Sequence, residues 1–268
     1  MCLIKPDHRY SYSQLSSFSE CPFGYYLKQI EEKEELPNAF AQQGKLIHDL
    51  LNRWAKGELT KEQLPIVYDQ TYSQAVQASF PRMLSAKGYT EKTRQLGLDY
   101  FKNFQGFPGF SIVSSEEEFD MPFKLTDGTT RPFLAYVDLI LRNDFTNGLY
   151  VVDHKSKSWA TFRKERDSMY KQQYLYSYFV HEKYGEWPEV LMFSLFKENG
   201  KTDEREFSMD EYNKTLEWAT KAIHTIESYD ILDWMECKKQ KTVGKPDMFC
   251  EYICGTRQYC PYSIRRSS

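Results

Sequence analysis

The sequence lacks a long apolar run and an N-terminal leader. Its 268 residues have a mean hydropathy of −0.66, whereas a membrane-spanning helix needs about 20 consecutive, mostly apolar residues. The first seven residues, Met1-Cys2-Leu3-Ile4-Lys5-Pro6-Asp7, contain no basic region followed by an apolar stretch, so we predict no signal peptide. These absences exclude a membrane span and predict a cytoplasmic protein.

An excess of charge of one sign is also lacking. Lys and Arg number 35 and Asp and Glu 38, which leaves a net charge of −3 and a pI of about 6.0. This balance excludes a nonspecific polycation. It does not exclude a nucleic-acid partner, because the negative charge of a carboxylate-rich metal site can cancel the positive charge of a local basic groove in the net charge of the chain. Apolar residues make up 41% of the chain, which is enough to bury a core. The length suits one large domain or two small ones, and we predict a single domain over residues 1–268.

Apolar periodicity divides the chain into a helical first part and a mixed second part. Turn signals at Asp127-Gly128, Asn147-Gly148 and Asn199-Gly200 separate short apolar runs that are typical of strands. The order of elements favours an α/β fold with a central mixed sheet flanked by helices and a helical insertion at about 57–106. Helices are predicted over 13–30 (capped by Ser13, broken at Pro22), 38–56, 61–79, 90–105, 160–185 and 209–228 (capped by Ser208), strands over 112–123, 133–141, 149–154, 190–196 and 204–207, and an irregular tail beyond 228.

Two of the predicted strands form a hairpin that carries carboxylates among apolar residues. Asp138 lies inside an apolar strand, and Asp153 and Lys155 end the next one. Residues two apart share a face of a strand, about 7 Å from each other. A buried carboxylate needs a metal or a cation, so this hairpin could bind a divalent ion and activate water. For both aspartates to share one face, the numbers of paired residues must sum to an odd number, for example 138 opposite 153 and 142 opposite 149. The plainer interpretation is an Asp153–Lys155 ion pair at a strand end.

Three further polar groups accompany the hairpin in the sequence. His48 follows Gly44 by one helical turn, and this glycine would let the helix approach another element closely; alternatively, the histidine is hydrogen-bonded at a packing face. Glu116, with Glu118 as second choice, lies on the strand before the hairpin, where an exposed acidic face is the alternative. Gln172 and Tyr176 lie one turn apart on the long helix and could hold the lysine, although surface tyrosines are the ordinary reading.

Six cysteines occur, and three of them fall within eleven residues near the end of the sequence. In a reducing compartment such cysteines are metal ligands or free thiols more often than disulfides. The set comprises Cys2, Cys21, Cys237, Cys250, Cys254 and Cys260.

The ordered set of these motifs resembles the PD-(D/E)XK nuclease superfamily, in particular the RecB-type nucleases and the CRISPR-associated adaptation exonucleases. The similarity spans about residues 10–262. It depends on Cys21, Gly44…His48, Glu116, Asp138, Asp153-His154-Lys155, Gln172…Tyr176 and Cys250…Cys254…Cys260. The sequence departs from the family's pattern at two points. Ala135 stands where the family often has a glycine, and Cys250 and Cys254 are separated by three residues instead of two.

The resemblance implies a role for each of these residues. His48, Asp138 and Asp153 would bind Mg²⁺ or Mn²⁺, with Glu116 as the family's glutamate. Lys155 would orient the attacking water and stabilise charge, with support from Gln172 and Tyr176. The resemblance also implies that Cys21, Cys250, Cys254 and Cys260 bind a [4Fe–4S] cluster; four thiolates also suit zinc, and Cys2 and Cys237 would be spare.

The implied function is metal-dependent DNA exonuclease activity in DNA recombination, repair or end processing. The partner would be DNA, single-stranded or with free ends. The chain contains no G-x-x-x-x-G-K-[ST] motif, so a recombinase, helicase or annealing protein could act beside it. The alternatives are a non-catalytic subunit that binds DNA ends or a partner, and an RNA-processing nuclease of the same fold. Cations near the site in sequence, Lys157, Arg163, Lys164 and Arg166, are candidates for phosphate contacts.

Overall fold

A computed structural model describes residues 3–85, 87–240 and 249–261 of the chain. Residue contacts divide the chain into two compact units. Unit 1 comprises Met1–Asn38, Asp120–Leu134 and Lys214–Ser268, and unit 2 comprises Ala39–Phe119 and Ala135–Asn213. No helix in the described residues is long and apolar enough to cross a membrane.

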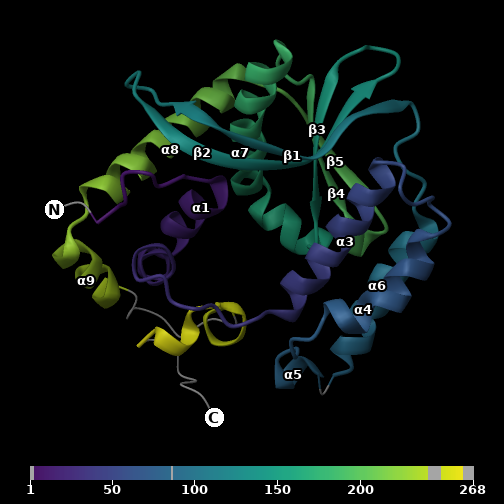
Figure 1. Cartoon of the computed structure of the whole chain (residues 1–268), viewed down its shortest axis with the longest axis horizontal. Helices are drawn as coiled ribbons and strands as arrows, with labels where there is room; N and C mark the ends of the chain where they lie inside the picture. Colours follow the sequence, from purple (N-terminus) through teal and green to yellow (C-terminus); the bar gives the residue numbers. More distant parts are fainter. Residues whose placement is uncertain (1–2, 86, 241–248, 262–268) are drawn as a thin grey trace. The chain divides into compact units, whose positions relative to one another are not determined.

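The central element is a five-stranded sheet in the order β1-β2-β3-β4-β5 (Figure 1). Its pairs β2–β3 and β4–β5 are antiparallel and its pair β3–β4 is parallel, so the sheet is mixed. Helices flank it, and the predicted α/β fold is therefore confirmed. The strands are β1 (Phe110–Lys124), β2 (Thr130–Asn143), β3 (Leu149–Lys155), β4 (Val190–Leu195) and β5 (Lys201–Glu206).

The register of the β2–β3 hairpin is the predicted one. Arg142 lies opposite Leu149, and Leu139 lies opposite Val152. Continued by one residue, this register sets Asp138 against Asp153 on one face of the sheet. The turn contains Asn147 with a positive φ of 62°, a conformation that asparagine tolerates better than most residues. The hairpin therefore brings both carboxylates to the same end of the same face.

Helices of unit 2 lie on the two faces of β3 and β4 (Figure 1). On one face, α7 (Trp159–Tyr184) packs through Phe162 and Tyr170 against Phe193 of β4. On the other face, Leu139, Val152 and their neighbours form an apolar cluster against which Ala55 of α3 (Ala39–Ala55) packs. A second cluster joins α3 to helices in the 57–106 region, where α4 (Leu64–Ala75), α5 (Arg82–Ser85) and α6 (Tyr89–Asn103) occur.

The helices of unit 1 differ from the prediction at two points. The N-cap of α1 (Tyr12–Glu20) is Ser11 and not Ser13, because the Ser11 hydroxyl accepts the backbone N–H of Gln14. The tail predicted to be irregular contains α9 (Ile231–Gln240), whose Trp234 is fully buried and stacks on Tyr25. Helix α8 (Met209–Ser228) is capped by Ser208 as predicted, and it begins in unit 2 and ends in unit 1. The remaining elements of unit 1 are α2 (Pro22–Tyr25), η1 (Tyr26–Ile30), η3 (Phe249–Ile253) and η4 (Arg257–Tyr259).

Candidate active site

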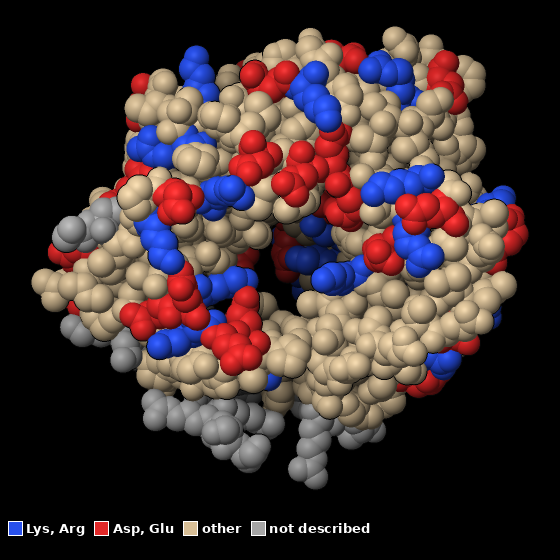
Figure 2. Space-filling model, in the orientation of Figure 1, with Lys and Arg blue, Asp and Glu red and all other residues tan. Residues whose placement is uncertain are grey.

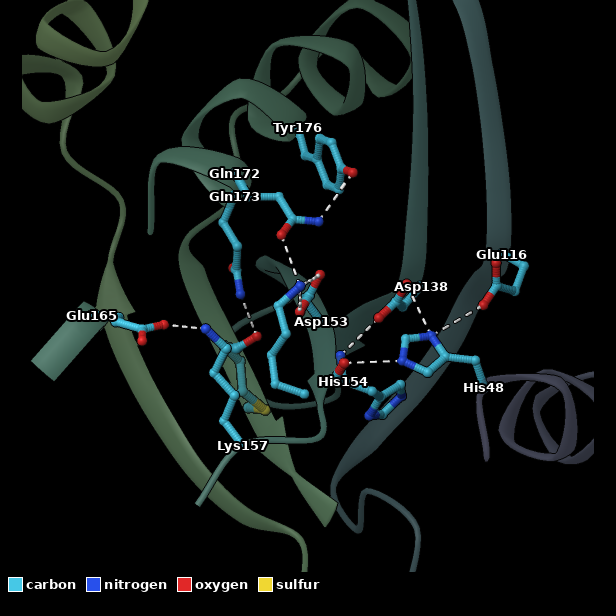
Figure 3. A network of polar contacts seen from close by, with 12 residues as sticks. His48, Glu116, Asp138, Asp153, His154, Lys157, Glu165, Gln172, Gln173 and Tyr176 are labelled. Carbon is cyan, nitrogen blue, oxygen red and sulfur yellow. Dashed lines mark hydrogen bonds and ion pairs between the residues drawn. The ribbon is translucent and has the colours of Figure 1, made fainter. Parts of the chain in front are cut away.

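A cluster of three ligand-type side chains lies at the end of the hairpin (Figure 3). His48 of α3 has its Nδ1 atom 3.4 Å from Asp138 Oδ1 and 3.5 Å from Glu116 Oε1. Ligand atoms of these three residues all lie within 4.8 Å of one another. The His48 Nε2 atom is 3.0 Å from the carbonyl oxygen of His154, to which its N–H can donate. In the neutral ring this bond leaves the Nδ1 lone pair directed at the carboxylates, which is how an outer partner orients a metal-binding histidine.

Gly44, one turn before His48, does not serve a close helix contact. No atom lies within 4 Å of the position that a Cβ atom would take there, so that expectation is wrong. The glycine instead leaves open space beside the histidine.

Glu116 is the glutamate of the cluster, and its backbone is strained. It has a φ of 46° inside β1, a left-handed conformation that costs a non-glycine residue about 1–3 kcal/mol. Glu117 instead accepts a hydrogen bond from Tyr184, and Glu118 accepts one from Tyr136. The strained residue is thus the one of the three that faces the histidine, and such strain is commonly found at functional sites.

Replacing Glu116 with glycine is expected to weaken Mn²⁺ binding by at least about tenfold, because an oxygen ligand is lost. The melting temperature should not fall, since glycine adopts a positive φ without strain. Mn²⁺ titration followed by electron paramagnetic resonance measures the affinity. Glu118→Ala is the matched control and should bind Mn²⁺ within about twofold of wild type; equal binding by Glu116→Gly would contradict the assignment.

The two aspartates of the hairpin have different surroundings. Asp138 Oδ2 accepts the backbone N–H of His154 at 2.7 Å. Burial opposes its charge, but the neighbouring His48 outweighs burial and lowers the pKa of Asp138. Asp153, 2% exposed, has its pKa raised, because burial outweighs the attraction of Lys155. One aspartate is thus held as a carboxylate, and the other retains a proton more readily.

Lys155 lies between Asp153 and the long helix α7. Its Nζ atom is 2.8 Å from Asp153 Oδ2 and donates at 2.8 Å to Gln172 Oε1. Gln172 Nε2 in turn donates to the Tyr176 hydroxyl at 3.0 Å (Figure 3). The structure therefore brings the predicted lysine, glutamine and tyrosine into one chain of contacts, which holds the ammonium group beside the buried carboxylate.

These donors fit a hard divalent ion. Carboxylate oxygens suit Mg²⁺ and Mn²⁺, and an imidazole nitrogen is a ligand that transition-metal ions accept more readily than Mg²⁺ does. Asp153 is buried, and its Oδ2 atom is paired with the Lys155 ammonium group at 2.8 Å. His48, Glu116 and Asp138 would hold such an ion, and Asp153 lies on the same face of the hairpin.

Comparison with known proteins identifies the family of the chain. A family model of the PD-(D/E)XK nuclease superfamily matches residues 9–262. The chain belongs to this superfamily. Among solved structures, one from Eubacterium rectale described as "Putative exonuclease" is similar, with 13% sequence identity, a TM-score of 0.42, and coverage of 90% of this chain and 91% of that chain. Among curated proteins, none matches the chain.

Membership of the PD-(D/E)XK superfamily makes a divalent metal the expected occupant of the cluster. Metal binding at this site is expected to depend on pH. Burial alone would lower the pKa of His48, but the carboxylates of Asp138 and Glu116 raise it to about 10. A metal requires the unprotonated nitrogen, so binding releases that proton.

Apparent Mn²⁺ affinity is therefore expected to rise with pH, by up to about tenfold per unit between about pH 7 and pH 9. The raised His48 pKa sets the sign, because protonated His48 competes with the metal throughout this range. Isothermal titration in buffers of different ionisation enthalpy counts the released proton. Affinity that is constant with pH would contradict a His48 ligand.

The predicted cysteine ligands lie in unit 1, outside this PD-(D/E)XK site. Leu36 N donates to Gly255 O at 2.8 Å, so the segment before α3 meets the cysteine-bearing tail. The Cys21 sulfur accepts the Gly24 N–H at 3.1 Å. Among the described residues no three cysteine sulfurs lie within 4.8 Å of one another. Cys2 lies outside the described residues, and Cys237, predicted to be spare, is buried.

Two features of the site escaped the sequence analysis. His154 contributes its backbone to both halves of the cluster, donating to Asp138 and accepting from His48. No side-chain pattern could reveal this, because any residue offers the same backbone atoms. The second is a pair of lysines, Lys45 on α3 and Lys56 directly after it, which line the groove beside His48. Their spacing from His48 in the sequence was the available signal.

Proposed function

We propose that this chain is a Mg²⁺- or Mn²⁺-dependent DNA exonuclease that acts in recombination, repair or end processing. The observation that supports it is the position of Lys155. Its ammonium group is fixed by Gln172 against buried Asp153, on the same hairpin as the cluster of Asp138, His48 and Glu116. Ligand donors and a positioned cation together are what metal-assisted phosphodiester hydrolysis requires.

Each residue has a defined part in this chemistry. His48, Glu116, Asp138 and Asp153 would hold the ion, which when bound neutralises phosphate charge and lowers the pKa of a coordinated water. Lys155 orients the attacking water and stabilises negative charge that develops on the phosphate. Gln172 and Tyr176 keep the lysine side chain in place. In this proposal α7 supplies the positioning residues, and α3 and the strands supply the metal ligands.

A non-catalytic subunit that binds DNA ends or a partner is the competing function. Such a subunit has no use for a lysine that is held beside a buried aspartate. Burying Asp153 costs free energy that a binding role alone would not select. The complete set of donors and Lys155 therefore favours catalysis.

The test is cleavage of end-labelled single-stranded DNA, duplex DNA, circular DNA and RNA, each with Mg²⁺, Mn²⁺ or chelator. We expect DNA with free ends to be degraded in metal and circular DNA to be spared. Degradation of RNA alone would assign the RNA-processing alternative. Binding without cleavage in any metal would assign the non-catalytic one.

We further propose that Cys21, Cys250, Cys254 and Cys260 bind a [4Fe–4S] cluster, with zinc as the alternative. The backbone pairing of Leu36 with Gly255 supports this, because it brings the chain ends together in unit 1. A cluster spaces its ligand sulfurs around its own body, so it does not need them as close as a single zinc ion does. A recombinase, helicase or annealing protein remains the proposed partner class.

A further inference from the structure

A groove of about 670 Å³ runs along α3 beside the metal-type cluster. It is bordered by one stripe of the helix, at spacings of three and four residues, and by Glu116 and Tyr136 from the strands. The open space at Gly44 belongs to it. This volume is in the range of ligand sites. The groove residues that the argument uses are Gly44, Lys45, His48, Asp49 and Asn52 of α3, and Lys56 directly after it.

The two lysines of the groove lie on opposite sides of His48 along the helix. Lys45 precedes His48 by three residues and Lys56 follows it by eight. At a rise of about 1.5 Å per residue, they lie about 4–5 Å and about 12 Å from His48 along the axis. The last turn continues to Lys56, because its N–H donates to Asn52 O at 2.9 Å. The cluster is therefore flanked by positive charge on both sides.

Neither charge is neutralised within the described part of the chain. Lys45 and Lys56 are exposed, and neither forms an ion pair with a described carboxylate, including the exposed Asp49 between them. By contrast, two of the cations that sequence proximity favoured are already engaged. Lys157 pairs with Glu165, and Arg166 pairs with Asp203.

The face drawn in Figure 2 shows no broad basic patch among its described residues. Basic and acidic side chains are interspersed over the face drawn in Figure 2, in keeping with the net charge of −3. A nucleic-acid strand must then be held by a local arrangement of cations. Two unpaired lysines in a groove on either side of a metal-type cluster provide one.

We infer that Lys45 and Lys56 bind backbone phosphates on the two sides of the scissile bond, so that the strand runs along α3 and short oligonucleotides are released. This rests on the proposed nuclease function. Hydrolysis joins the water oxygen to phosphorus, breaks one P–O ester bond and transfers a proton to the leaving oxygen. With about 3.4 Å per nucleotide of a stacked strand, Lys56 lies about three to four nucleotides from the cut, and first products of about two to four nucleotides are expected.

The binding test measures the salt dependence of affinity for a labelled single strand in chelator, where no cleavage takes place. Each phosphate contact contributes about −0.7 to the slope of log affinity against log salt for single strands. Lys45→Ala and Lys56→Ala should each reduce the slope by about that amount, and Lys45→Arg and Lys56→Arg should restore it. Lys102→Ala, an exposed lysine on α6 away from the groove, is the control and should leave the slope unchanged.

The kinetic test measures product lengths under conditions of one cut per strand, with KM and kcat for the same variants. We expect KM to rise severalfold and kcat to stay within about twofold in Lys45→Ala and Lys56→Ala. Two results would overturn the groove assignment but not the nuclease proposal. The first is that the wild type releases mononucleotides as first products. The second is that the wild type cleaves DNA while Lys45→Ala and Lys56→Ala have the same salt slope as Lys102→Ala. Reduced slopes without any cleavage by wild type would reject the nuclease proposal and leave the phosphate contacts standing.

Discussion

Replacing Lys155 with alanine is expected to lower DNA cleavage by at least about 100-fold while DNA binding changes little. The Lys155 ammonium group is fixed within hydrogen-bond distance of both Asp153 and Gln172. Loss of one positioned electrostatic stabiliser costs about 10²–10³ in rate. Binding should survive, because phosphate affinity comes mainly from other Lys and Arg contacts. Single-turnover cleavage and a filter-binding titration measure the two quantities separately.

The matched control is Lys61→Ala, which removes an exposed lysine from the connection between α3 and α4. Its cleavage rate should equal that of wild type. Asp153→Asn should lose activity to a similar extent as Lys155→Ala, since it removes a carboxylate from the face shared with Asp138. A Lys155→Ala protein that is folded and cleaves at the wild-type rate would show that the lysine has no catalytic part.

Replacing Cys21 with alanine is expected to remove iron and much of the stability of the protein. Cys21 is more than two hundred residues from Cys250 in sequence, and a shared cluster closes that long loop and so restricts the unfolded state. Wild-type protein purified without oxygen should be brown, absorb broadly near about 400 nm and contain about four irons per chain. Iron analysis and thermal melts, run on wild type and variant together, measure both effects.

Cys237→Ala is the control for the cysteine prediction. Cys237 is a buried cysteine of the same unit as Cys21, but it has no predicted ligand role. It should retain the full iron content. Colourless protein with one bound zinc would reject the cluster and keep the ligands, whereas iron lost from Cys237→Ala and kept in Cys254→Ala would reject the ligand set.

The hairpin could be predicted because its physical determinants are local. Alternating and continuous apolar runs, with turn residues between them, specify the strands β2 and β3. The requirement that Asp138 and Asp153 share a face then restricts the pairing to residue numbers with an odd sum, and the structure meets it with 142 opposite 149. Patterns of this kind depend on neighbours in sequence, so they can be recognised without knowledge of the rest of the fold.

Other features depend on contacts that are distant in sequence. Helix α9 lies in a polar stretch, and burial of Trp234 against Tyr25 favours its formation. Three consecutive glutamates look alike in sequence, and only the positive φ of Glu116 turns that one toward His48. The groove lysines were missed because candidates were sought near Lys155 in sequence, whereas α3 supplies the wall of the site.

The central claim is that the hairpin cluster carries out metal-dependent hydrolysis of DNA. Its most direct test is the cleavage rate of labelled linear single-stranded DNA as a function of Mn²⁺ concentration, using metal-stripped protein. The account predicts no cleavage in chelator and a saturable recovery with Mn²⁺ that His48→Ala weakens. Cleavage that persists without metal, or folded, DNA-binding protein that remains inactive at every Mn²⁺ concentration, would contradict it.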